Sequence, residues 1–165
     1  MMTGGRVKYL INFLLLFCTC FVFAEPGTIY LFRHSEKEKG VNPHLTQAGV
    51  HRARQLSLLI ERTKPLTLYS TDYNRTLETA NELAKDLSAK VQVYNPRELD
   101  QFKQKVLMHS GTVIIVGHSN TSVELAALFS ELTVDKMAES EFARYFLLQR
   151  TGQNYHLSDL QMAFE

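Results

Sequence analysis

The chain has 165 residues and a formal net charge of +1, from 18 basic and 17 acidic side chains. This balance lacks the basic excess that nucleic-acid-binding proteins use, and the sequence has no acidic tail. The length is enough for one domain with its own hydrophobic core.

Residues 1–24 have the layout of a secretory signal peptide. Arg6 and Lys8 form a positive region, an apolar run follows from residue 9 to residue 23, and small residues precede a cleavage point before Glu25. The run of about 15 residues is short for a membrane-spanning helix, which needs roughly 20. We therefore expect an exported protein, periplasmic or secreted, without stable membrane insertion after cleavage. An uncleaved N-terminal anchor is the alternative.

Both cysteines, Cys18 and Cys20, lie inside this segment, so the mature domain at residues 25–165 is expected to contain none. Such a domain has no disulfide, no thiol nucleophile and no cysteine metal site. The scattered histidines outside the motifs described below show no metal-ligand spacing. We expect a protein without a bound metal or cofactor.

Short apolar runs alternate with amphipathic segments along residues 25–165. In chain order, the pattern predicts a strand at 28–32, a helix at 46–60, a strand at 66–70, a helix at 77–87, a short strand at 91–94, a helix at 100–108, a strand at 112–116, a helix at 120–129, and closing strands at 145–148 and 155–157. Thr46 is expected to cap the first helix, and Asn120 or Thr121 the last. The alternation predicts an α/β fold, a three-layer α/β/α sandwich with a mostly parallel central sheet.

Four potentially cationic side chains follow three of the predicted strands. Arg33 and His34 follow the first strand, Arg75 follows the second, and His118 follows the strand at 112–116. The carboxyl ends of parallel strands share one edge of a sheet, where ligands bind. Such a cluster would repel itself unless an anion occupies it, and arginine side chains match phosphate oxygens. The sequence therefore predicts a phosphate site at this edge.

Four segments occur in the order of a known set of motifs. They are residues 31–34 (LFRH), 45–49 (LTQAG), 69–80 (YSTDYNRTLETA) and 113–119 (VIIVGHS). Together they resemble the histidine phosphatase superfamily, also called phosphoglycerate-mutase-like, and in size the phosphohistidine-phosphatase type. The resemblance implies that His34 is the nucleophile, which becomes phosphohistidine. It also implies that Arg33, Arg75 and His118 bind the phosphoryl oxygens, with His118 counted among the catalytic residues.

The residues after His34 depart from the commonest family pattern. Most members have glycine where this chain has Ser35, although Glu36 and Lys37 fit a subgroup with alanine at that place. The Ser35 hydroxyl could donate to phosphate or could cap a turn. The charged run at residues 36–40 is typical of a solvated loop, and its position after His34 also allows it to line the substrate entrance.

The family resemblance also implies a carboxylic acid that protonates the leaving group. The segment after the predicted third strand contains Glu98, in an Arg-Glu-Leu sequence similar to the donor segment of the family, and Asp100 is the rival. Both residues could instead simply begin the next helix, because carboxylates are favoured there by the helix dipole.

We therefore expect a phosphomonoester phosphatase that acts through a phosphohistidine intermediate. Export favours a phosphorylated small molecule or an envelope glycan phosphate as the substrate. The short stretch between Arg75 and His118 disfavours a mutase, which needs a lid over its substrate. The alternative is a catalytically degenerate protein of the same fold that binds a phosphorylated ligand without turnover.

Overall fold

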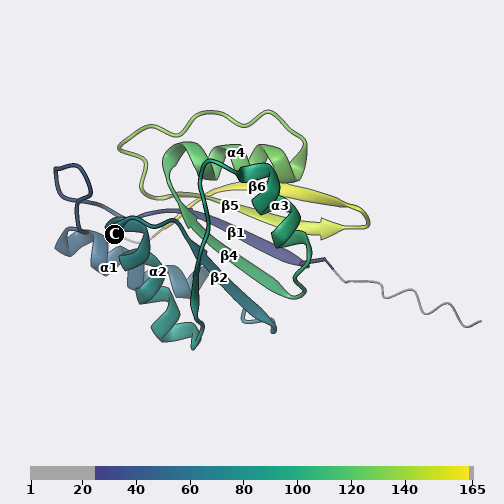
Figure 1. The fold of residues 1–165 in the computed structure, drawn as a ribbon, viewed down its shortest axis with the longest axis horizontal. Helices are drawn as coiled ribbons and strands as arrows, with labels where there is room; N and C mark the ends of the chain where they lie inside the picture. Colours follow the sequence, from purple (N-terminus) through teal and green to yellow (C-terminus); the bar gives the residue numbers. More distant parts are fainter. Residues whose placement is uncertain (1–24, 164–165) are drawn as a thin grey trace, which may run out of the picture.

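A six-stranded sheet forms the centre of the domain, in the order β3-β2-β4-β1-β5-β6 (Figure 1). The computed structural model describes residues 25–163, so the predicted signal peptide lies outside the described residues. The elements are β1 (Thr28–Arg33), α1 (Gln47–Gln55), the 3-10 helix η1 (Leu56–Leu59), β2 (Leu66–Ser70), α2 (Asn74–Leu87), β3 (Val91–Val93), α3 (Leu99–Leu107), β4 (Thr112–Gly117), α4 (Ser119–Ser130), β5 (Arg144–Thr151) and β6 (Asn154–Gln161).

The sheet is mostly parallel, as predicted. Strands β1, β2, β3 and β4 run parallel to one another, whereas β5 runs antiparallel to β1 and forms a hairpin with β6. In the register between β1 and β4, Arg33 pairs with Gly117, and in the register between β2 and β4, Ser70 pairs with Val116. The ends of these three strands therefore lie side by side at one edge of the sheet.

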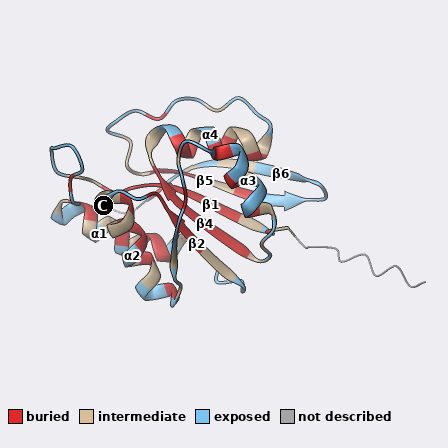
Figure 2. Cartoon of the chain, viewed as in Figure 1, coloured by how far each residue is buried: buried red, intermediate tan, exposed pale blue. Residues whose placement is uncertain are grey.

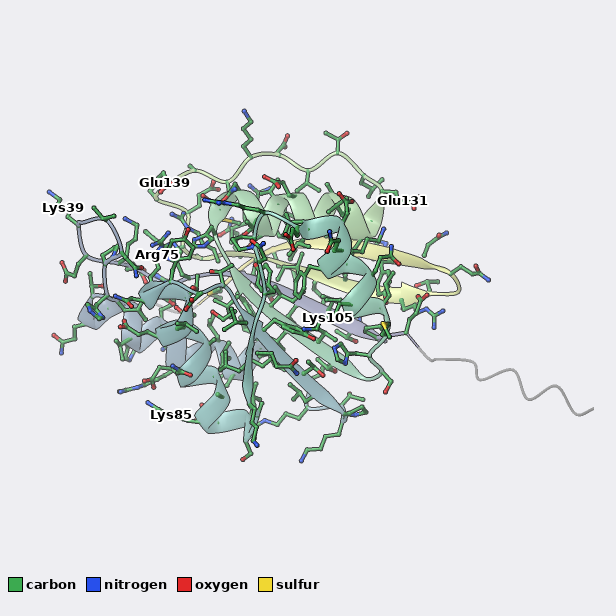
Figure 3. The ribbon with its side chains drawn as sticks, viewed as in Figure 1. Lys39, Arg75, Lys85, Lys105, Glu131 and Glu139 are labelled. Atoms are coloured by element: carbon green, nitrogen blue, oxygen red, sulfur yellow. The ribbon has the colours of Figure 1, made fainter. Side chains whose placement is uncertain are left out.

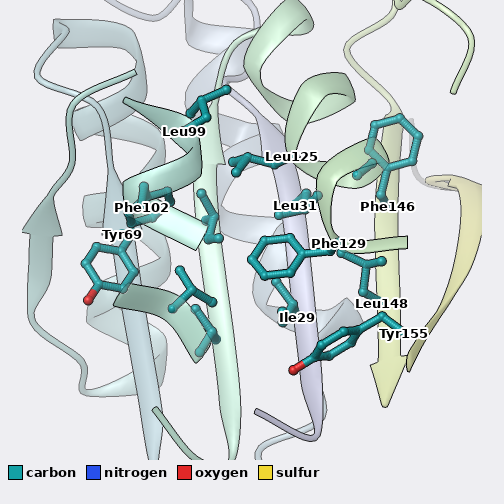
Figure 4. Packing of buried hydrophobic residues seen from close by; sticks show 14 of the residues in the cluster. Ile29, Leu31, Tyr69, Leu99, Phe102, Leu125, Phe129, Phe146, Leu148 and Tyr155 are labelled. Carbon is teal, nitrogen blue, oxygen red and sulfur yellow. The ribbon is translucent and has the colours of Figure 1, made fainter. Parts of the chain in front are cut away.

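Helices cover both faces of the sheet and give it two hydrophobic cores. Side chains alternate between the faces of a strand, so Ile29 and Leu31 of β1 lie on one side, in the same cluster as Phe102 of α3 and Leu125 of α4 (Figure 4). Tyr30 and the other side chains that point to the opposite face of the sheet pack against α2 and the residues around η1. Figure 2 shows the central strands almost wholly buried and β6 largely exposed at the edge. The predicted three-layer α/β/α arrangement is confirmed.

Several element boundaries differ from the prediction; α2, for example, begins at Asn74 rather than at residue 77, and the two closing strands are longer than predicted. Thr46 does cap the first helix, accepting a hydrogen bond from Gly49 N at 3.0 Å, but α1 ends at Gln55 and continues only as the 3-10 helix to Leu59. The last helix begins one residue after His118, which is its N-cap, whereas Asn120 or Thr121 was predicted in that place. Thr121 still contributes, because its hydroxyl oxygen accepts a hydrogen bond from His118 N at 2.8 Å.

Among residues 25–163, no helix combines the length and the apolar composition that crossing a membrane requires.

Candidate active site

A cavity of about 350 Å³ opens at the edge of the sheet where β1, β2 and β4 end. Its lining residues come from the end of β1 and the loop after it, from the loop after β2 and the start of α2, from the turn after β3, from the start of α4 with the residue before it, and from the segment before β5: Arg33, His34, Lys37, Tyr73, Arg75, Pro96, Arg97, His118, Ser119, Asn120, Thr121 and Glu139. The four residues predicted to bind phosphate therefore share one cavity.

Arg33 lines the cavity and is only 1% exposed. Its Nη1 donates to the carbonyl oxygen of Ala138 at 2.8 Å, and its Nη2 donates to Glu139 Oε2 at 3.1 Å. The guanidinium carbon lies 4.3 Å from the centre of the Phe142 ring. Its Nε is buried and lacks a hydrogen-bond partner within the described residues. One segment, residues 138–142, thus fixes this arginine, while part of its donor capacity is unused.

One ring nitrogen of His34 is hydrogen-bonded to the backbone. Its Nδ1 lies 2.8 Å from the Ser35 carbonyl oxygen, and its backbone N–H donates to Gly117 O at 2.9 Å. A carbonyl oxygen can only accept, so Nδ1 carries the hydrogen and the neutral ring keeps a lone pair on Nε2. The pKa of His34 is lowered to about 3, mainly by burial; the charges of Arg33 and Arg75 act in the same direction, and the hydrogen bond to Ser35 opposes them. The imidazole is therefore neutral near pH 7.

His118 lies 5.7 Å from His34 between ring centres and is also neutral. Burial lowers its pKa to about 4, with a further contribution from Arg75. Arg75 Nη2 donates to Nδ1 of His118 at 3.2 Å, so the hydrogen must be on Nε2, which donates to Thr71 Oγ1 at 3.0 Å. Thr71 Oγ1 in turn donates to Thr76 Oγ1 at 2.9 Å. This chain of hydrogen bonds fixes the tautomer and the orientation of His118.

The side chain of Ser35 does not cap a turn among the described residues. Its side chain is buried and does not line the cavity, and its hydroxyl has no hydrogen-bond partner among the described residues. Its backbone N–H instead donates to Thr79 Oγ1 of α2 at 3.1 Å, which ties the segment after β1 to that helix. Lys37, from the charged run, does line the cavity.

The structure places the carboxylates differently from the sequence motif. Glu98 and Asp100 do not line the cavity that holds His34; each lines a separate depression, Glu98 beside Tyr94 and Asp100 beside Glu124. Among the described residues, the carboxylate that does line it is Glu139. Glu139 Oε1 accepts from Ser119 Oγ at 3.1 Å while Oε2 pairs with Arg33 (Figure 3 shows Glu139 and Arg75 at the same end of the molecule). No motif in the sequence pointed to Glu139.

Within residues 25–163, no group of three or more histidine, cysteine, aspartate or glutamate side chains is arranged to hold a metal ion. The positive charge in the cavity comes from side chains. At pH 7 these are Arg33, Arg75, Lys37 and Arg97, with Glu139 as the one carboxylate among the described lining residues.

Comparison with known proteins relates part of the sequence to one protein family. The sequence matches the family described as the histidine phosphatase superfamily, branch 1, over residues 29–102. This match includes Arg33, His34 and Arg75. A search of curated proteins by sequence found no match.

Solved structures share the fold at low sequence identity. A mycobacterial glucosyl-3-phosphoglycerate phosphatase is 13% identical over 81% of this chain and 97% of its own, with a TM-score of 0.61. YhfR of Bacillus stearothermophilus is 16% identical over 80% and 95%, with a TM-score of 0.64. A protein of Agrobacterium tumefaciens provisionally named as the phosphohistidine phosphatase SixA is 14% identical over 82% and 98%, with a TM-score of 0.58. In its sequence match over residues 29–102, its fold and a cavity that unites Arg33, His34, Arg75 and His118, the chain is similar to the histidine phosphatase superfamily.

Proposed function

We propose that the protein is a phosphomonoester phosphatase, a phosphoric monoester hydrolase in which His34 is the nucleophile. The observation that supports this most directly is the state of His34. Its Nε2 has a free lone pair in a cavity that it shares with Arg33, Arg75 and His118. The similar mycobacterial phosphatase has been solved with VO3 and with inorganic phosphate, which agrees with an anion site in this fold.

The proposed reaction has two steps. In the first, Nε2 of His34 forms a bond to phosphorus, the bond from phosphorus to the ester oxygen breaks, and the leaving alcohol takes a proton. In the second, a water molecule attacks phosphorus, the phosphorus–nitrogen bond breaks, and inorganic phosphate is released. Dividing the reaction in this way lowers each barrier. Arg33 and Arg75 neutralise the oxygens in both steps, so no metal is required.

His118 contributes to the same charge stabilisation. Bound phosphate competes for Arg75 and places negative charge beside the imidazole, which favours its protonated form. Once protonated, His118 can donate from Nδ1 to a phosphoryl oxygen while Nε2 continues to donate to Thr71.

The proton donor is where the sequence motif and the geometry point to different residues. The motif favours Glu98, with Asp100 as the rival, whereas Glu139 is the carboxylate that lines the cavity. We propose Glu139 for the role. A donor must hold a proton, and the negative charge of a bound phosphate dianion favours the neutral form of a carboxyl beside it.

We expect His34→Ala to abolish hydrolysis of a phosphomonoester in buffer that contains a chelator. Brief reaction of the wild-type protein with labelled substrate, followed by denaturation in base, is expected to leave acid-labile phosphate on His34, found by mass spectrometry. His156→Ala is the matched control, because His156 lies exposed on β6. Its activity is expected to equal that of the wild type.

The same experiment separates the phosphatase from a degenerate binding protein. Inorganic phosphate is expected to raise the unfolding temperature of His34→Ala, since both arginines remain, and this shows that the variant is folded. A wild-type protein that binds phosphate but forms no phosphohistidine and releases no phosphate from any ester would support the binding alternative. Wild-type turnover by His34→Ala would refute the mechanism.

We propose a phosphorylated small molecule or an envelope glycan phosphate as the substrate, and a periplasmic or secreted location. The support for the location is the sequence pattern of residues 1–24. An exported enzyme does not meet phosphorylated proteins of the cytosol, which disfavours them as substrates.

A further inference from the structure

We infer that Lys37 and Arg97 form a second anion subsite at the edge of the active-site cavity, so that preferred substrates contain a carboxylate or a second phosphate beside the scissile phosphate. This inference rests on the proposed function and deepens it. Both residues line the cavity that contains His34, but neither belongs to the four residues assigned to the scissile phosphate.

Lys37 is presented by an anchored loop. Its backbone forms a bridge with Leu45, and the preceding residue, Glu36, accepts two hydrogen bonds from Arg52 Nε, at 2.8 and 3.0 Å. Further along, Thr46 N donates to Glu36 O at 2.9 Å. These contacts hold the start of the loop against α1. The lysine therefore reaches the cavity from a fixed point of the backbone, although its charged run resembles an ordinary solvated loop.

Arg97 is presented by a turn between β3 and α3. Its backbone N–H donates to Asn95 Oδ1 at 3.1 Å, and Glu98 N donates to Asn95 O at 3.3 Å. The neighbouring Pro96 also lines the cavity and restricts the backbone there. The turn thus holds the arginine beside the cavity by local contacts alone.

Neither cation is neutralised within the part of the chain that the structure describes. Lys37 and Arg97 form no ion pair there, in contrast to Arg52 with Glu36 and Arg144 with Asp159. Arg97 also borders a second depression that contains Asp100 and Glu124, but no oxygen of either carboxylate lies within 4.0 Å of it. Two donors of positive charge in the cavity are therefore available to a ligand.

Charge balance indicates what that ligand contains. With both histidines neutral, the four basic residues of the cavity and the single carboxylate of Glu139 give 4 − 1 = +3. A phosphomonoester dianion leaves one positive charge uncompensated even if Glu139 remains in place. A substrate with one further anionic group balances the cavity, and an arginine is suited to bind a carboxylate or phosphate through paired hydrogen bonds.

The simpler alternative is electrostatic steering. In that case Lys37 and Arg97 raise the association rate of every phosphate ester alike, and salt reduces the effect for all of them. A subsite instead discriminates between esters that differ in the second group. The two explanations therefore differ in specificity rather than in the rate for any single substrate.

The test compares phosphoglycolate with its neutral amide, and glucose 1,6-bisphosphate with glucose 6-phosphate. We expect kcat/KM to favour phosphoglycolate by about tenfold, and the bisphosphate by more than the factor of two that two phosphates alone give. In the double variant Lys37→Gln/Arg97→Gln, both preferences are expected to fall to about twofold or less. The control is Arg62→Gln/Lys90→Gln, which removes the same charge. Both of its residues are exposed and precede β2 and β3, at the opposite edge of the sheet.

Each outcome decides the inference. If only one of the two preferences is seen and the double variant loses it, the subsite holds, and the pair concerned identifies the second group as a carboxylate or a phosphate. Equal values for charged and neutral esters in the wild type would overturn it, as would a double variant that loses rate equally on both, which is steering. If no ester is hydrolysed, the proposed function fails instead. The inference is then decided by calorimetric binding of phosphoglycolate and its amide to the wild type and the double variant, with the same tenfold expectation.

Discussion

At the scale of single residues, backbone carbonyls and hydroxyls determine what the two histidines can do. The Ser35 carbonyl takes the Nδ1 hydrogen of His34 and leaves Nε2 free, whereas Thr71 takes the Nε2 hydrogen of His118. The two rings are thus held in opposite tautomers. In the proposed mechanism this difference separates a nucleophile from a group that stabilises charge.

The proton donor is tested by glutamine substitutions. We expect Glu139→Gln to slow alkyl phosphates, whose leaving groups need a proton, by roughly 10²–10⁴-fold. It is expected to change the rate for 4-nitrophenyl phosphate by little, because that leaving group departs without a proton. Glu131→Gln, which removes an exposed carboxylate away from the cavity, is the control (Figure 3).

Parallel measurements on Glu98→Gln and Asp100→Asn decide between the motif and the geometry. Selective loss on alkyl phosphates in one of them, with Glu139→Gln unaffected, would assign the donor to the segment before α3. Such a result would require that segment to move toward His34 when substrate binds, because neither side chain lines the cavity.

The four phosphate-binding candidates could be predicted because of their places after strands. Three of them follow the apolar run of a strand directly, and Arg75 lies in the first turn of the helix that follows β2. The strand pattern is visible in the sequence, and the edge rule for parallel sheets brings Arg33, Arg75 and His118 together. Glu139 could not be predicted in this way. It belongs to a segment without regular structure, and its contact with Arg33 spans 106 positions of the chain. A contact between residues so far apart in the chain produces no periodic pattern in the sequence.

At the scale of elements, Gly49 explains why one of the motifs contains a glycine. A Cβ atom built on Gly49 in α1 would lie 2.1 Å from the backbone oxygen of Glu36, so only glycine allows the segment after β1 to pass this close to the helix. That segment starts with His34 and continues to Lys37. The contact therefore links the position of α1 to the segment that carries two of the cavity-lining residues.

We expect Gly49→Ala to destabilise the protein by about 1–3 kcal/mol, the usual cost of forcing an extra methyl group into a packed site. Because the backbone of Glu36 must shift, kcat/KM is also expected to fall. Urea unfolding and steady-state assays measure the two effects. Gly27→Ala is the matched control, since its Cβ would meet only Gly111 O at an ordinary 3.8 Å. If Gly49→Ala has the stability and activity of Gly27→Ala, the contact does not constrain the loop.

The order of the elements was predictable, whereas some of their ends were not. Apolar spacing continues to Ile60, so the sequence predicted one helix across residues 46–60, but the α-helix ends at Gln55. Leu56 and Ile60 are both buried in the core beside α2, and the tighter 3-10 turn between them satisfies that packing. Periodicity indicates which residues are buried, but it does not distinguish the two kinds of turn.

At the scale of the whole molecule, export is the prediction that bears most on the substrate. When the full chain is produced in a bacterial host, we expect mass spectrometry of the periplasmic fraction to find Glu25, or a residue close to it, at the N-terminus. Replacing the positive region with Arg6→Glu/Lys8→Glu is expected to leave the protein unprocessed, since signal peptides require that charge. Recovery of the wild type with Met1 intact in the soluble cytosolic fraction would contradict export.

The cationic cavity also makes the stability of the fold depend on pH. The pKa is lowered to about 3 for His34 and to about 4 for His118, mainly by burial, and nearby Arg33 and Arg75 act in the same direction. In the unfolded chain a histidine has a pKa of about 6.5. Between these values the unfolded chain binds protons that the folded protein does not. The free energy of unfolding therefore falls as the pH falls from about 6.5 toward 4.

Urea unfolding at several pH values tests this linkage. We expect the midpoint to fall steadily below pH 6.5, and we expect His34→Asn/His118→Asn to reduce the slope, whereas the exposed His156→Asn is expected to keep it. Burial lowers the pKa of His109 as well, so some slope is expected to remain in the double variant. Inorganic phosphate is expected to oppose the loss, because an anion between the two arginines favours the charged imidazoles. An unchanged slope in the double variant would mean that the cavity does not set the acid sensitivity of the fold.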